Sequence, residues 1–143
     1  MQADYLVNIF QGPGYTLFLH MQRISEAYLR LTNADTAEMA KTALKELRAA
    51  AGDCEKLIRN ILHTNDCPDY LVLNVNKFAE RNWTLDVMSG YLVNASHYLA
   101  RFIHTPSNEG KVKELTAMYY LIRDLSECAL EVNEENYRRE LTE

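Results

Sequence analysis

Histidine and cysteine are the residues of this chain from which a metal site or a nucleophile would be built. His97 and His104 lie seven residues apart, close to two turns of a helix, so both can lie on one helical face. A zinc site needs three or four converging ligands, and no carboxylate or cysteine lies beside this pair at a suitable spacing. The chain also lacks a Glu-x-x-His pair of the kind that holds two metals in helical bundles. We therefore predict no metal ion and no other cofactor.

The three cysteines do not form a reactive pair. Cys54, Cys67 and Cys128 are odd in number and lie far apart, which favours a reducing, intracellular setting. Cys54 and Cys128 fall in apolar helical stripes, where a thiol is usually a small, inert core group. The glycines form no phosphate-binding motif. We therefore predict that the protein is not an enzyme.

One segment nevertheless has a spacing that suggests acid–base chemistry. Arg59-Asn60-Ile61-Leu62-His63 resembles the arginine-to-histidine motif of the HEPN ribonucleases, which are also helical bundles. It is one residue shorter than that family's Arg-Asn-x-x-x-His, which changes where His63 points relative to Arg59. Polar residues on the outer face of an amphipathic helix are the alternative interpretation.

Helical periodicity runs along nearly the whole chain and predicts an all-α fold in a single domain, residues 1–143. We expect a short segment at 5–10, helices at about 15–31 and 35–64, a short helix at 68–80, and long helices at 82–104 and 112–128. Asp35 and Glu38 resemble a capping box, and Gly52 lies either within one long helix or at a bend between two. The predicted inward stripe of the helix at 15–31 consists of Leu17, Phe18, Met21, Ile24 and Tyr28.

The expected helix at 82–104 has almost no charge. Only Asp86 and Arg101 are ionised, and Asn82 can act as its N-cap. A helix that is apolar round most of its circumference must be covered by other helices, so we predict that it is the central helix of a bundle.

The overall charge and hydropathy exclude two classes of partner. The net charge of −5 and the lack of a concentrated basic face argue against nucleic-acid binding. No run of eighteen or more apolar residues is present, so we expect no membrane span.

Several segments resemble, in order, the homology segments of the Bcl-2 family of apoptosis regulators. They are residues 11–15, residues 42–60 with Gly52-Asp53, Asn82-Trp83 with the apolar helix that follows, and residues 132–141. The resemblance implies a Bcl-2-like bundle around a central apolar helix. Because the chain is short and has no anchor segment after its tail, it is most similar to virus-encoded members, for which a location in the host cytoplasm is expected.

The resemblance also implies a function. The protein would inhibit apoptosis by holding the amphipathic death-motif helix of pro-apoptotic Bcl-2 proteins in a hydrophobic groove. Self-association through such a groove, as a homodimer, is an alternative arrangement. The groove residues that we predict are Cys54, Leu57, Ile58, Ile61, Lys77, Phe78, Arg81, Asn82, Leu85, Val87 and Met88.

One departure from the family affects how a partner would bind. Thr84-Leu85 stands where the family has Gly-Arg, and the arginine normally pairs with an aspartate of the partner. We therefore expect binding to be mostly apolar. Two other functions stay open: a helical chaperone or adaptor that binds another protein's helix, such as a flagellar export chaperone, and a HEPN-like ribonuclease.

Overall fold

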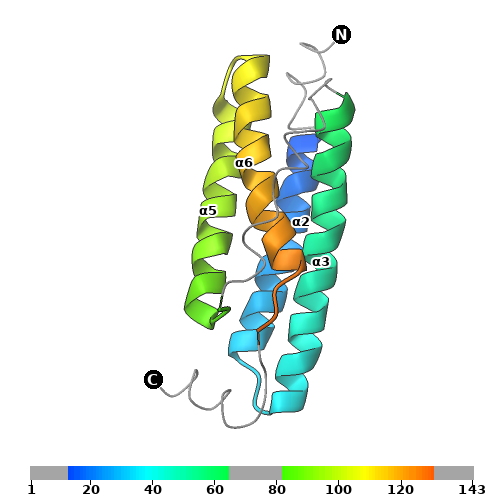
Figure 1. Ribbon diagram of the computed structural model, residues 1–143, viewed down its shortest axis with the longest axis vertical. Helices are drawn as coiled ribbons and strands as arrows, with labels where there is room; N and C mark the ends of the chain where they lie inside the picture. Colours follow the sequence, from blue (N-terminus) through cyan, green and yellow to red (C-terminus); the bar gives the residue numbers. More distant parts are fainter. Residues whose placement is uncertain (1–12, 65–81, 131–143) are drawn as a thin grey trace.

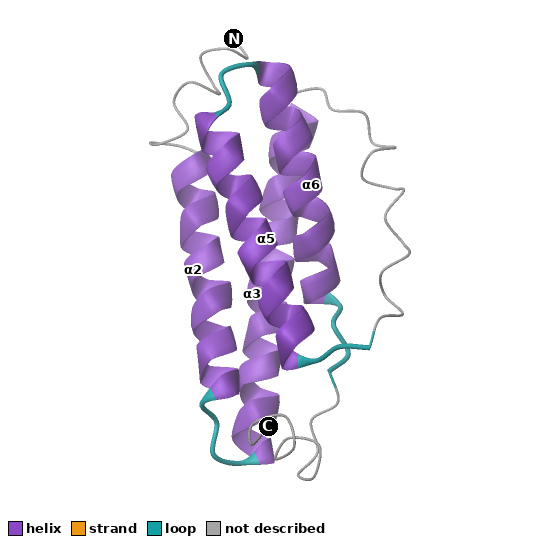
Figure 2. Ribbon diagram, turned by 90° about the vertical axis from the view of Figure 1, so that its left-hand side faces the viewer, coloured by secondary structure: helices purple, strands orange, loops and turns teal. Residues whose placement is uncertain are grey.

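The computed structural model describes residues 13–64 and 82–130, and these residues form four α-helices. The helices are α2 (Pro13–Thr32), α3 (Ala37–Thr64), α5 (Leu85–His104) and α6 (Asn108–Ser126). They run side by side along the long axis of the molecule (Figure 1), and the described residues contain no strand (Figure 2). The prediction of an all-α helical bundle is confirmed. The expected segments at 5–10 and 68–80 and the polar tail from residue 133 lie outside the described residues.

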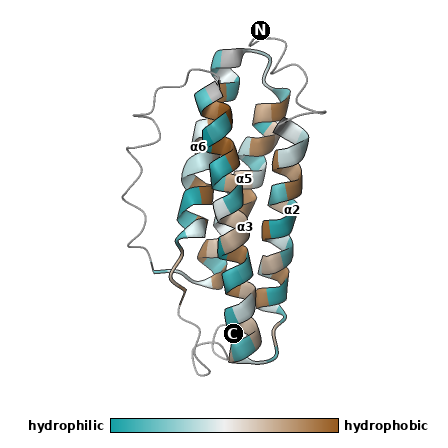
Figure 3. Ribbon diagram, turned by 90° about the vertical axis from the view of Figure 1, so that its right-hand side faces the viewer, coloured by the Kyte–Doolittle hydropathy of each residue, from teal (hydrophilic) through white to brown (hydrophobic). Residues whose placement is uncertain are grey.

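The helices pack as two hairpins joined along one side. α3 packs extensively against both α2 and α6, and α6 also packs against α5, whereas the contact between α2 and α5 is the thinnest of the four. Hydrophobic and hydrophilic residues alternate around each helix (Figure 3), as expected for amphipathic helices that share one core. Of these four helix pairs, α2 and α5 are therefore packed least closely.

The position of α5 differs from the prediction of a central helix. Its buried stripe consists of Met88, Tyr91, Leu92, Ala95, Leu99 and Phe102, at spacings of three and four. On the remaining face Val93 is 65% exposed, and Ser96 and Ala100 are exposed as well. Among the described residues α5 is one of four outer helices, so a helix covered on all sides is not confirmed. Its low charge comes partly from small neutral residues that face solvent.

Two helix starts differ by one or two residues from the sequence prediction. The backbone N–H of Met39 donates to Thr36 Oγ1 at 3.1 Å, so Thr36 caps α3 in place of Asp35. Likewise Thr84, not Asn82, is the N-cap of α5, because its hydroxyl accepts from the N–H of Val87. A side-chain oxygen satisfies an otherwise unpaired N–H in both cases, an interaction that stabilises a helix by about 1 kcal/mol.

A buried lysine joins the ends of α5 and α6. Lys111 of α6 is 5% exposed, and its Nζ donates to the carbonyl oxygens of Phe102, at 2.8 Å, and Ile103, at 3.2 Å. These carbonyls belong to the last turn of α5, where no backbone donor is available within the helix. The ammonium group also lies 5.4 Å from the centre of the Phe102 ring. Burial lowers the pKa of Lys111, and the two carbonyls supply the hydrogen bonds that the charged group has lost from water.

Candidate functional site

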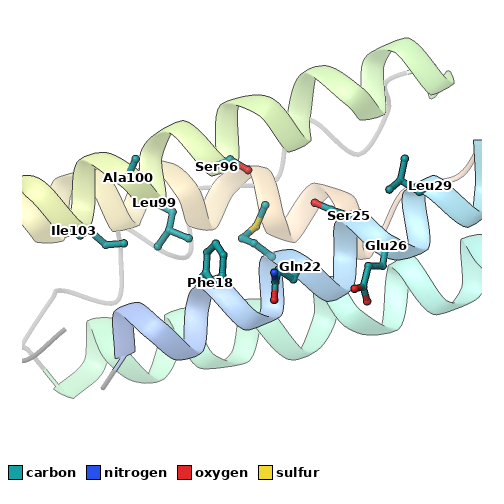
Figure 4. A pocket seen from close by; sticks show the side chains of 10 residues that line it. Phe18, Gln22, Ser25, Glu26, Leu29, Ser96, Leu99, Ala100 and Ile103 are labelled. Atoms are coloured by element: carbon teal, nitrogen blue, oxygen red, sulfur yellow. The ribbon is translucent and has the colours of Figure 1, made fainter. Parts of the chain in front are cut away.

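An open apolar hollow of about 380 Å³ lies between α2 and α5. It occupies the side of the bundle where the helix contact is thinnest (Figure 4). We call it the α2–α5 groove. It is lined by Phe18, Met21, Gln22, Ser25, Glu26, Leu29, Ser96, Leu99, Ala100 and Ile103.

The groove exists because α5 presents short side chains to α2. Ser96 and Ala100 lie on the groove face of α5, and neither is long enough to fill the space to the opposite helix. Met21 and Leu99, each 4% exposed, form the buried floor. In Figure 4, Phe18 extends from α2 toward Leu99.

Two large hydrophobic side chains line this groove while remaining half in solvent. Phe18 is 47% exposed and Leu29 is 57% exposed. Single exposed hydrophobic residues are common on protein surfaces, but here they lie along one hollow with an apolar floor. A hollow with an apolar floor and exposed hydrophobic side chains at its edge is a candidate binding site for another apolar surface.

The groove is lined by a carboxylate, whereas the arginines of α2 and α5 pair with other helices. Glu26 is the one ionisable residue among those that line the groove in the described part of the chain. The arginines of α2 and α5 turn toward the neighbouring helices, where each pairs with a carboxylate. These pairs are Arg23 with Asp53 at 3.4 Å, Arg30 with Glu46 at 3.5 Å, and Arg101 with Glu114 at 3.3 Å.

The groove residues predicted from the sequence lie elsewhere. Cys54, Ile58 and Met88 are 0% exposed and Ile61 is 3% exposed, so all four belong to the core. Leu57, Leu85 and Val87 are partly buried and pack against that core, and Asn82 is exposed. None of these eight residues lines the α2–α5 groove. Lys77, Phe78 and Arg81 lie outside the described residues.

The sequence held one signal for the observed groove that we interpreted differently. We expected Phe18 to face inward with Leu17, but the buried stripe of α2 runs through Leu17, Met21 and Ile24 and leaves Phe18 to one side. Leu29 also falls outside that stripe. Leu19 of α2 and Val93 of α5 are also exposed apolar residues outside the buried stripes and do not line the groove, so this pattern alone does not locate it.

The arginine of the ribonuclease-like segment is engaged in an ion pair. Arg59 pairs with Glu55, whose Oε1 also accepts a hydrogen bond from the Tyr119 hydroxyl at 3.1 Å. Glu55 is only 8% exposed, so this three-residue cluster ties α3 to α6 inside the bundle. His63 is exposed near the end of α3.

The described cysteines and the His97–His104 pair do not form a reactive site or a metal site. Burial raises the pKa of Cys54 to about 12 and that of Cys128 to about 11, so both thiols stay protonated at neutral pH. Cys67 lies outside the described residues. His97 and His104 are both exposed, and no cluster of three or more metal-ligating side chains occurs in residues 13–64 and 82–130.

In residues 13–64 and 82–130 the fold is a four-helix bundle with an apolar hollow between α2 and α5. Within the described residues, no helix is both long enough and apolar enough to cross a membrane. Comparison of the chain with models of protein families, with curated proteins and with solved structures found no match.

Proposed function

We propose that the protein is a helix-binding protein, which takes the apolar face of another protein's amphipathic helix in the α2–α5 groove. The observation that carries this proposal is a hollow with a buried apolar floor and a half-exposed hydrophobic side chain, Phe18 or Leu29, toward each end of its α2 side. Phe18 and Leu29 are eleven residues apart on α2, which corresponds to about 16 Å of helix. Three turns of a bound helix cover the same length and present anchors at positions i, i+3 or i+4, and i+7.

Burial of apolar side chains is the main source of binding free energy that such a groove offers. Each aliphatic or aromatic anchor that becomes fully buried contributes about 1.5–3 kcal/mol before the losses of motional freedom are subtracted. Three anchors supply roughly 5–9 kcal/mol on this scale. Because the hollow between α2 and α5 is open at the surface, the partner helix does not have to separate packed core residues.

We further propose that the partner is the death-motif helix of pro-apoptotic Bcl-2 proteins, so that the protein inhibits apoptosis by sequestering that helix. The support for this partner is the ordered resemblance of residues 42–60, Asn82-Trp83 and 132–141 to the Bcl-2 homology segments. The groove would then be formed by α2 and α5, without the eight described residues that the resemblance suggested.

The test is to titrate a panel of fluorescent death-motif peptides against the purified chain and to follow fluorescence anisotropy. Ala100→Arg places a long charged side chain in the groove and should abolish binding. Asn94→Arg makes the same charge change at an exposed position of α5 that does not line the groove, and should leave binding unchanged. If no peptide in the panel binds, or if both variants bind like the wild type, the proposed partner or the proposed site is wrong.

A chaperone or adaptor for another protein's helix is the second candidate. It is favoured by one observation: no residue of the 42–60 segment, which resembles a Bcl-2 homology segment, lines the groove. An amphipathic helix of unrelated sequence that binds, and is displaced by Ala100→Arg, while the whole death-motif panel fails would favour this candidate.

A further inference from the structure

A single carboxylate lies in an otherwise neutral groove. Glu26 is exposed, lines the groove from the α2 side, and makes no ion pair within the described residues. The nearest basic side chains of the same helix, Arg23 and Arg30, are directed to Asp53 and Glu46 of α3. The groove therefore offers a bound helix one unneutralised negative charge beside an apolar floor.

We infer that the helix bound in the α2–α5 groove carries a lysine or arginine that pairs with Glu26. This inference rests on the proposed helix-binding function. Docking an apolar face over the groove removes water from around Glu26, and a facing cation compensates for the lost hydration of the carboxylate. A neutral partner leaves that loss uncompensated, and an acidic partner adds repulsion.

The position of Glu26 also determines where the cation lies on the partner. Glu26 precedes Leu29 by three residues, which is about one helical turn. The basic residue therefore lies beside the anchor that packs against Leu29, at one end of the apolar stripe. The anchor that packs against Phe18 lies at the other end of the stripe.

The sign of this charge is opposite to that expected from the family resemblance. Bcl-2-like grooves offer an arginine to an aspartate of the partner, and Thr84-Leu85 replaces the residues that include this arginine here. Arg101, the arginine of α5, is paired with Glu114 of α6. Among death-motif helices, those with a basic residue at the Leu29 end would therefore bind most tightly.

In a two-fold contact, a second copy of this chain complements the groove less well than a convex helix does. A two-fold symmetric contact places the same patch of both subunits face to face, so each hollow would meet another hollow. The space of about 380 Å³ in each subunit would stay unfilled, and unfilled apolar space destabilises a contact. The two Glu26 carboxylates would also lie on the same interface. A convex helix with a positive charge is complementary in both shape and sign.

The experiment uses two synthetic peptides that are identical except at one position. Both are amphipathic, helix-forming peptides with leucine at positions i, i+4 and i+7, and the residue beside the last leucine is lysine in one and glutamate in the other. Affinities are measured by fluorescence anisotropy for the wild-type chain and for Glu26→Gln, Glu26→Lys and Glu38→Gln. Glu38 is exposed on α3 and does not line the groove, so Glu38→Gln controls for the change in net charge.

We expect the wild-type chain to bind the lysine peptide about three- to tenfold more tightly than the glutamate peptide, as for a pair that is partly exposed to solvent. Glu26→Gln should remove this preference, Glu26→Lys should reverse it, and Glu38→Gln should retain it. The preference should also weaken as salt is raised.

The other outcomes separate the two proposals. Equal binding of both peptides, with loss of binding in Ala100→Arg, would refute the pairing with Glu26 while leaving the helix-binding function intact. No binding of either peptide, together with failure of the death-motif panel, would refute the function itself. A dimer in solution that Ala100→Arg converts to a monomer would show that a second copy covers the groove, which refutes the inferred partner.

Discussion

Truncation of Met88 distinguishes a core residue from a groove residue. The sequence places Met88 in the partner groove, whereas the structure buries it completely within the core. Met88→Ala removes a methylene, a sulfur and a methyl group. At about 0.8 kcal/mol for each group of this size, the lost transfer free energy is roughly 2.4 kcal/mol. The residual cavity adds to this loss, so we expect a total of about 3 kcal/mol, within the usual ~2–5 kcal/mol for such truncations.

The free energy of unfolding can be measured by urea denaturation, with far-ultraviolet circular dichroism and the fluorescence of Trp83 as probes. Trp83 is the only tryptophan of the chain, and its ring lies 4.9 Å from that of Tyr91, so its emission reports on the packing at the start of α5. A loss of about 3 kcal/mol lowers the urea midpoint by roughly 1–3 M. Val93→Ala is the matched control on the same helix, because Val93 is 65% exposed. We expect this variant to stay within about 0.5 kcal/mol of the wild type.

Peptide binding supplies the second readout. Met88 does not line the α2–α5 groove, so folded Met88→Ala protein should bind a helical peptide with the affinity of the wild type. A loss of stability below about 1 kcal/mol, accompanied by weaker peptide binding, would refute the placement of Met88 in the core. It would instead support the groove predicted from the sequence.

Tyr119→Phe removes a hydrogen bond to the buried carboxylate of Glu55 and should lower the free energy of unfolding by about 1.5–3 kcal/mol in urea denaturation. Gly52→Ala should raise the free energy of unfolding by about 0.5–1 kcal/mol, because glycine inside a helix is less stable than alanine and an added Cβ there meets no neighbouring atom within 4 Å. Gly110→Ala should lower the free energy of unfolding, because the added Cβ would lie 2.5 Å from a neighbouring threonine methyl group. Burial lowers the pKa of His20 below 6.5, so the His20 side chain binds a proton more readily in the unfolded chain than in the folded one. The free energy of unfolding therefore falls as the pH is lowered through 6.5. His20→Gln should reduce this fall, measured as the difference in free energy of unfolding between about pH 8 and about pH 5.

Most of the secondary structure followed from local patterns. The helix expected at 15–31 is observed as Pro13–Thr32, and the stretch expected at 35–64 is one helix, Ala37–Thr64, that continues through Gly52. Apolar spacings of three and four residues bring side chains to one face of a helix wherever that helix lies in the fold. The cap positions were less accurate, since Asp35 and Thr36, or Asn82 and Thr84, are neighbouring residues with similar capping ability.

The groove was not predictable in the same way. The low charge of α5 is compatible with two arrangements: a helix surrounded by others, or a helix with a neutral face open to solvent. Val93, Ser96 and Ala100 give no local signal that separates the two. The eight described residues that we assigned to a groove share the spacing of core residues, and burial of Cys54, Ile58, Ile61 and Met88 places them in that core.

Helical periodicity is a property of neighbouring residues, so the amino-acid pattern predicts the amphipathic helices and the residues that share a face of each helix. Which of these faces meet depends on contacts between helices. α2 and α5 approach each other loosely, since Ser96 and Ala100 are too short to fill the space opposite Phe18, and the arginines are paired with α3 and α6. The three ion pairs join residues far apart in the chain, and they leave Glu26 as the charged residue that a bound helix would meet.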